Sequence, residues 1–160
     1  MVIKIATCDY RALAALRYQI RLFLREGDAA ARRAGLEPQQ YLLLLALRGL
    51  PEGAEATIQT LADSLALKHN STVELIDRLE KRGYVRRSRS RGDRRSVVVS
   101  LLQRGKKVLA RVVRERLTEL CAGGAALVDA IDALLEPDLK LRRRNKSAQW
   151  NQRKRRKKQS

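Results

Sequence analysis

Residues 57–101 contain two short amphipathic segments, a brief connection between them and, directly afterwards, two β-prone runs. In the first segment, apolar residues recur at helical spacing from Ile58 to Leu65, and Thr57 can cap the free backbone amides at its start. The connection covers only residues 66–68. Because so short a turn holds two helices at a steep angle to each other, the sequence predicts a closely packed helix pair with a β-hairpin beside it.

The second segment, residues 69–83, is predicted to form the second helix of this pair. Ser71 and Glu74 have the spacing of a capping box, and Gly83 is suited to end the helix. One face of the helix is apolar and is therefore predicted to point inward. This inward stripe consists of Val73, Ile76 and Leu79.

The hairpin is predicted from two β-prone runs, residues 84–88 and 96–101, with residues 89–95 at its tip. Between residues 84 and 96 there are six arginines and a single acid, Asp93. Crowded guanidinium groups repel one another unless an anion lies nearby, and each can donate two hydrogen bonds to one phosphate. The composition therefore indicates a surface for a polyanion. The arginines are Arg86, Arg87, Arg89, Arg91, Arg94 and Arg95.

With these elements in this order, residues 8–135 resemble a MarR-type transcriptional regulator. The resemblance implies a mainly α-helical winged helix-turn-helix fold, with a small β-hairpin wing and flanking N- and C-terminal dimerisation helices. The family usually leaves the wing through Leu-Thr, where the threonine caps the next helix. This chain has Leu101-Leu102 instead, so the start of the next helix stays open. The matching pieces are Leu61-Ala62 and Leu65, Ser71-Thr72-Val73 with Asp77-Arg78-Leu79-Glu80, Gly83-Tyr84-Val85, Asp93-Arg94-Arg95, and Val99-Ser100-Leu101 leading to Gly105.

The chain is predicted to divide into a MarR-like domain, residues 1–139, and a basic tail, residues 140–160. Within the domain, the winged core covers about residues 36–101, and the dimerisation helices cover about residues 9–34 and 103–135. The length of 160 residues is that of one domain with a substantial core.

Local signals predict the limits of the helices outside the winged pair. Asp9 can cap the first helix and Gly35 can end it. Pro38 suits the first turn of a helix over residues 39–47, which is apolar nearly all round and therefore expected to be buried. After the wing, helices are predicted over residues 106–122 and 125–135, separated by Gly123-Gly124.

The terminal helices carry more apolar side chains than the short winged core can cover. A twofold homodimer, in which each chain buries the stripes of the other, is the economical solution, and the resemblance implies the same arrangement. The alternative is that these helices fold back on their own core.

The tail has a composition of its own, with eleven basic residues and no acid between residues 140 and 160. Because such dense like charge cannot pack, disorder is predicted beyond about Arg144. Three roles stay open: contact with flanking phosphates with Trp150 as a stacking residue, a solvated appendage, or an aberrant end of the reading frame.

The formal net charge of +18 and the pI of about 11.0 favour a polyanionic partner, nucleic acid rather than a membrane surface. No apolar run is long enough to span a bilayer and residues 1–7 lack the features of a secretory signal, so a cytoplasmic location is expected. Cys8 and Cys121 stand far apart without companion ligands. Neither a zinc site, a disulfide nor a cofactor is therefore predicted.

The N-terminal half of the second helix is expected to enter the major groove of double-stranded DNA. Glu74 can accept a hydrogen bond from cytosine and Arg78 can donate two to guanine, although an ion pair between them is the alternative. For His69 the alternative is a surface position without a role. The side chains predicted to reach bases or phosphates are His69, Asn70, Ser71, Thr72, Glu74 and Arg78.

On the wing, arginines are expected to lie along the minor groove and its phosphates, where the negative potential is deepest. Asp93 is expected to be structural, holding the hairpin or a neighbouring arginine. The wing residues predicted to contact DNA are Arg89, Arg91, Arg94 and Arg95.

The sequence predicts a dimeric, sequence-specific transcriptional regulator, a repressor that a small ligand releases from a palindromic operator. The alternative is a chromatin-like or RNA-binding protein without sequence preference. An enzyme is not predicted, because the chain has no nucleophile–base pair and no phosphate-cradling glycine loop. MarR-like relatives often respond to aromatic carboxylates or phenolic compounds, which would suit Arg17, Tyr18 and Tyr41; these are equally suited to the core or the dimer interface.

Overall fold

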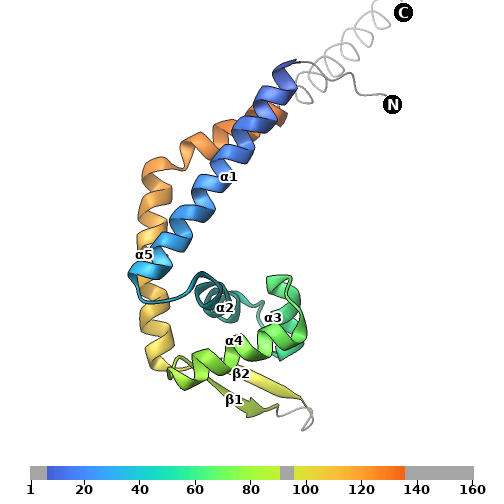
Figure 1. Ribbon diagram of the computed structural model, residues 1–160, viewed down its shortest axis with the longest axis vertical. Helices are drawn as coiled ribbons and strands as arrows, with labels where there is room; N and C mark the ends of the chain where they lie inside the picture. Colours follow the sequence, from blue (N-terminus) through green and yellow to red (C-terminus); the bar gives the residue numbers. More distant parts are fainter. Residues whose placement is uncertain (1–6, 91–95, 136–160) are drawn as a thin grey trace, which may run out of the picture. The chain divides into compact units, whose positions relative to one another are not determined.

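The computed structural model describes residues 7–90 and 96–135 and is mainly α-helical, with one two-stranded antiparallel hairpin (Figure 1). The predicted fold class is confirmed. A further helical run covers residues 125–135, after a turn at Gly124. The elements are α1 (Thr7–Arg33), α2 (Pro38–Gly49), α3 (Ile58–Leu65), α4 (His69–Lys81), β1 (Val85–Arg89), β2 (Val97–Leu101) and α5 (Gln103–Gly123).

The chain divides into two compact units. We call residues 24–118 the core unit, and residues 1–23 together with 119–160 the arm unit. The core unit holds the whole of α2, α3, α4 and the hairpin, together with the end of α1 and most of α5. Within the described residues, no helix is both long enough and apolar enough to cross a bilayer.

The hydrophobic core of the core unit is mainly aliphatic, and every helix of the unit and both strands contribute to it. Helix α2 contributes Leu43 and Leu44, which are fully buried, but Leu42 and Leu45 on its other side are 38% exposed. The prediction of a helix buried all round was therefore only half right. The apolar core residues are Ala30, Ala31, Leu36, Tyr41, Leu43, Leu44, Leu61, Leu75, Ile76, Leu79, Tyr84, Val85, Val99, Leu109 and Val112.

The turn between α3 and α4 forms as predicted. The Thr57 hydroxyl accepts a hydrogen bond from the amide of Thr60 at 3.1 Å and caps α3. Ala66 ends that helix in the left-handed region, with φ of 51°, and its amide donates to carbonyls of the last turn. Gly83 has φ of 69° after α4, a conformation that costs a glycine little.

The capping box predicted for α4 is wrong. The helix begins at His69 with Lys68 in extended conformation before it, and Lys68 makes no side-chain capping bond. Ser71 is therefore the third residue of the helix and already has helical geometry, which a capping residue does not. Glu74 lies one turn further on and cannot complete a box with it.

The limits of the other helices differ from the predicted ones by a few residues. Asp9 lies inside the first turn of α1, which begins at Thr7, so it is not the cap. Pro38 is the first residue of α2, as predicted. Helix α5 begins at Gln103, directly after Leu102 and three residues before the predicted start, which settles the question that Leu101-Leu102 raised. An early start is possible because helix N-termini can do without a side-chain cap.

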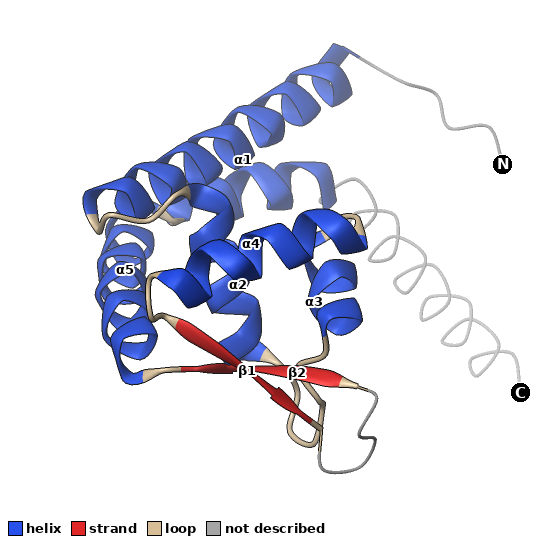
Figure 2. Ribbon diagram, turned by 60° about the horizontal axis from the view of Figure 1, so that its bottom comes forward, coloured by secondary structure: helices blue, strands red, loops and turns tan. Residues whose placement is uncertain are grey.

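The hairpin pairs Val85 with Leu101 at its base and Arg89 with Val97 towards its tip. Its second strand is also joined to the loop before α3, where the Val99 amide donates to the Ala56 carbonyl at 2.9 Å. Figure 2 shows the hairpin beneath α4 and the turn to α3 at the far end of that helix. Helix α4 thus contacts both its partner helix and the wing.

Candidate nucleic-acid interface

Helix α4 has a buried side and an exposed side, and its first turn is open to solvent. Leu75, Ile76 and Leu79 are buried and attach the helix to the core. The first three residues of the helix, His69, Asn70 and Ser71, are all exposed. These short polar and imidazole side chains stand at a helix N-terminus, where backbone amides point outward and favour anions.

Thr72 does not belong with them, and the prediction that it contacts DNA is wrong for this structure. Its side chain is fully buried, and its hydroxyl donates a hydrogen bond to the Lys68 carbonyl at 3.2 Å. It follows Ser71 by one position, which on a helix is a rotation of about 100° towards the core. No local pattern separates the two positions, because a threonine hydroxyl can bond within its own helix or reach a ligand.

Glu74 and Arg78 form the ion pair that was the alternative to base contact. The Arg78 guanidinium lies 3.5 Å from the Glu74 carboxylate, and the two side chains are 66% and 68% exposed. Pairs this exposed contribute little to stability and break readily. Both side chains therefore remain within reach of a ligand on the exposed side of α4.

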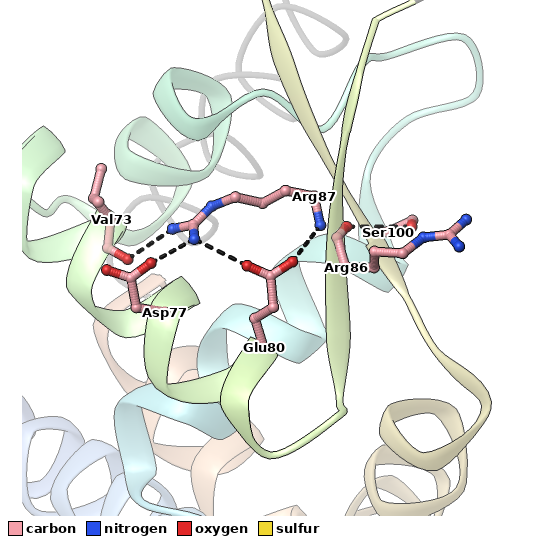
Figure 3. A network of polar contacts seen from close by, with 6 residues as sticks. All are labelled: Val73, Asp77, Glu80, Arg86, Arg87 and Ser100. Atoms are coloured by element: carbon pink, nitrogen blue, oxygen red, sulfur yellow. Dashed lines mark hydrogen bonds and ion pairs between the residues drawn. The ribbon is translucent and has the colours of Figure 1, made fainter.

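The hairpin arginines fall into two groups. Arg86 and Arg89 are exposed, whereas Arg87 turns towards α4 and is engaged by its acidic residues (Figure 3). One of the six cations that the composition assigned to a polyanion is therefore paired with carboxylates of the protein itself. Arg91, Arg94 and Arg95, together with Asp93 and the basic tail of residues 140–160, lie outside the described residues.

A second arginine cluster at the base of the wing was missed in the sequence. Arg82 donates hydrogen bonds to the Gly35 carbonyl at 2.8 Å and to the Gln40 side chain at 3.0 Å. Its guanidinium and that of Arg104 lie 4.9 and 5.2 Å from the centre of the buried Tyr84 ring, within cation–π range. No local pattern could have identified the contacts of Arg82 with Gly35 and Gln40, since these join residues more than forty positions apart.

The three residues considered for an effector do not share one unit. Arg17 and Tyr18 are exposed in the arm unit, whereas Tyr41 is buried in the core unit. Burial raises the pKa of the Tyr41 hydroxyl, an effect that the positive charge of Arg116 partly offsets. Tyr41 is therefore a neutral hydroxyl at physiological pH.

Metal-binding chemistry finds no support within the described residues, where no three His, Cys, Asp or Glu side chains group together. Cys8 and Cys121 are exposed thiols.

Taken together, the helix pair, its exposed first turn and the basic hairpin define a winged helix-turn-helix protein of the DNA-binding class. A model described as the MarR family matches residues 34–96. The uncharacterised HTH-type transcriptional regulator YfiV of Bacillus subtilis (strain 168) is 39% identical over 71 residues, which are 44% of this chain and 42% of YfiV. The chain thus spans less than half the length of that relative.

Solved structures agree over a longer stretch. The MarR family transcription regulator SP03579 superposes with a TM-score of 0.66 at 20% identity, over 87% of this chain and 91% of the other, which shows a shared fold. The transcriptional repressor CouR, bound to a 23-mer DNA duplex, is 31% identical over 78% of this chain and 87% of CouR, with a TM-score of 0.55. CouR from Rhodococcus jostii RHA1, bound to p-coumaroyl-CoA, aligns at 21% identity over 78% of this chain and 86% of the other, with a TM-score of 0.61.

The chain belongs to the MarR family of DNA-binding transcriptional regulators.

Proposed function

We propose that this protein is a homodimeric repressor that recognises a palindromic operator through the first turn of α4. The observation that carries the proposal is the exposure of His69, Asn70 and Ser71 on a helix whose opposite side is buried. A helix held in this way can insert its N-terminal end into the major groove without exposing apolar side chains. CouR, a repressor of the same fold, is bound to a DNA duplex.

Dimerisation is supported by the apolar side chains of the arm unit. Along its described helical segments, large apolar side chains are between 37% and 66% exposed, more than a monomer usually leaves in contact with water. A second copy of the chain would cover them by twofold packing of helices. They are Tyr10, Leu13, Tyr18, Ile20, Phe23, Leu120, Val128, Ile131 and Leu135.

The operator is expected to be an inverted repeat with half-sites one helical turn apart, roughly 10 base pairs, because a twofold dimer presents two copies of α4. Selection of bound genomic fragments recovers the sequence, and sedimentation of the protein measures its mass. Competition against bulk DNA at fixed salt tests the preference. A monomer that binds one half-site as tightly as the full repeat, or a dimer without preference over bulk DNA, would contradict the proposal.

Base reading and backbone contact are expected to respond to different substitutions. Ser71→Ala and Glu74→Ala should each cost about 1–3 kcal/mol on the operator, with little change on random duplex. Arg89→Ala should weaken binding to both and lower the slope of log affinity against log salt by about one, because one phosphate contact is lost. Anisotropy titrations at several salt concentrations measure both effects. If Arg89→Ala alone removed the preference for the operator, the roles of helix and wing would be reversed.

We further propose an aromatic or phenolic effector that lowers the affinity for DNA. The support is that CouR from Rhodococcus jostii RHA1, a protein of the same fold, is bound to p-coumaroyl-CoA. Of the three residues considered, Arg17 and Tyr18 are exposed and therefore open to an effector. Tyr41 is buried in the core unit and would support an effector site from within the core.

A further inference from the structure

We infer that Arg87 is a positioning residue, which sets the angle between the wing and α4 and so acts on DNA recognition without touching DNA. This inference rests on the proposed role of α4 as the reading helix. It concerns a residue that the composition of the hairpin placed among the cations available to a polyanion.

The contacts of Arg87 reach two turns of α4 from one point on β1 (Figure 3). Its Nη1 donates to the Asp77 carboxylate and, at 3.0 Å, to that of Glu80. Its Nη2 donates to the Val73 carbonyl at 3.1 Å, and its backbone amide donates to the Glu80 carboxylate at 2.8 Å. The acceptors stand at i, i+4 and i+7, and so lie along one side of the helix.

The planar guanidinium suits this arrangement because its donors point in fixed directions within one plane. A lysine ammonium at the same position has one nitrogen and cannot reach the carbonyl of Val73 and both carboxylates together. The bonds therefore hold the strand to the helix in one register and at one angle. The Arg87 side chain is 24% exposed, so the ion pairs are partly shielded from solvent.

The charges around Arg87 also exclude it from direct phosphate contact. Asp77 and Glu80 both face its guanidinium, and an approaching phosphate would have to displace one carboxylate while repelled by the other. Removal of Arg87 would leave these two negative charges together beside the proposed DNA surface. The loss of the link between β1 and α4 and the repulsion between the two carboxylates would both disturb α4, and no phosphate contact would be lost.

Arg86 supplies the matched control because it is the preceding residue of the same strand and its side chain lies on the opposite side of the hairpin (Figure 3). The Arg86 side chain is exposed, and its backbone carbonyl accepts a hydrogen bond from the Ser100 hydroxyl at 3.4 Å. Arg86→Lys keeps the charge on an exposed side chain, whereas Arg87→Lys keeps the charge and loses the bridging geometry.

Arg87→Lys is expected to weaken operator binding about tenfold, with random-duplex affinity and the salt slope unchanged, whereas Arg86→Lys stays within about twofold on both. Anisotropy titrations of the full chain at several salt concentrations measure these values. If Arg87→Lys retained operator affinity while Arg87→Ala lowered operator and random binding alike and reduced the salt slope by about one, Arg87 would be a phosphate contact and the inference would fail.

A double-mutant cycle on unfolding separates this inference from the proposed function. Arg87→Ala and Asp77→Ala should be coupled by at least about fivefold in the unfolding equilibrium constant, because each removes the partner of the other. The two substitutions could be coupled in a protein that has no preference for any DNA sequence. That result would confirm the link between the wing and α4. It would overturn both the proposed function and the role of Arg87 in recognition. Additive effects would overturn the inference even where the operator preference is found.

Discussion

Gly105→Ala is expected to destabilise the protein by about 3 kcal/mol, the largest effect that we expect from the addition of one methyl group. A Cβ at position 105 would lie 2.2 Å from the Tyr84 carbonyl oxygen and 3.0 Å from its carbon. Those atoms are backbone, and the same carbonyl accepts a hydrogen bond from the Leu102 amide at 2.9 Å. The first turn of α5 would have to move away from Tyr84, the residue before β1, and that hydrogen bond would be lost.

Chemical denaturation followed by circular dichroism measures the difference in the free energy of unfolding. Gly49→Ala is the matched control, since Gly49 is also helical and its Cβ would meet no atom within 4 Å. That variant is expected to be neutral or more stable by about 0.5–1 kcal/mol, because alanine is the better helix former. Equal stability of the two variants would show that α5 does not approach the wing so closely.

Leu79→Ala is expected to cost about 2–5 kcal/mol, because the leucine is fully buried in the last turns of α4 and its truncation leaves a cavity. Operator binding should fall with the folded fraction, although Leu79 contacts no DNA in the proposed complex. Thermal and denaturant unfolding measure the loss.

Leu42→Ala is the control for Leu79→Ala, since the same atoms are removed from a leucine that is 38% exposed. The loss in the free energy of unfolding is expected to stay below about 1.5 kcal/mol, because less apolar surface is buried at Leu42 and its truncation leaves no closed cavity. If the two truncations cost the same, α4 would not be attached to the core by its Leu79 side, and the exposed face assigned to DNA would have to be redrawn.

Arg87 and Arg82 show that an arginine in or beside a basic wing can be bound by the protein itself and so be unavailable to DNA. Charge counting treats all arginines in and beside such a hairpin as equivalent. Arg87 of β1, however, is paired with the acids of α4, and Arg82, which caps the end of α4, is paired with groups from α2 and the loop before it. Asp77 and Glu80 belong to the sequence motifs by which the chain resembles its family, and in the structure both form ion pairs with Arg87. They neutralise a cation that would otherwise add to the positive charge of the hairpin.

The sequence by itself determined the local elements of the core unit. Apolar spacing marked α3 and α4, Thr57 marked the start of the first, and the β-prone run of residues 96–101 with its three valines marked β2, because helical spacing and β propensity are properties of a few consecutive residues. The local signals failed at Ser71 and Asp9, where a residue suited to a cap lies inside the helix instead. A capping preference of about 1 kcal/mol is too small to set a helix start against the packing of the whole helix.

Only the tertiary structure decided which side chains of the candidate interface are available. Thr72 and Ser71 are neighbours with the same kind of side chain, and the packing of α4 on the core alone buries the first and exposes the second. Arg86 and Arg87 are identical neighbours, and only the position of α4 beside β1 supplies acids to one of them. These partners are seven to fourteen residues apart along the chain, and Arg82 reaches Gly35 across 47. Contacts at such separations depend on how the elements pack, and no local pattern in the sequence encodes that.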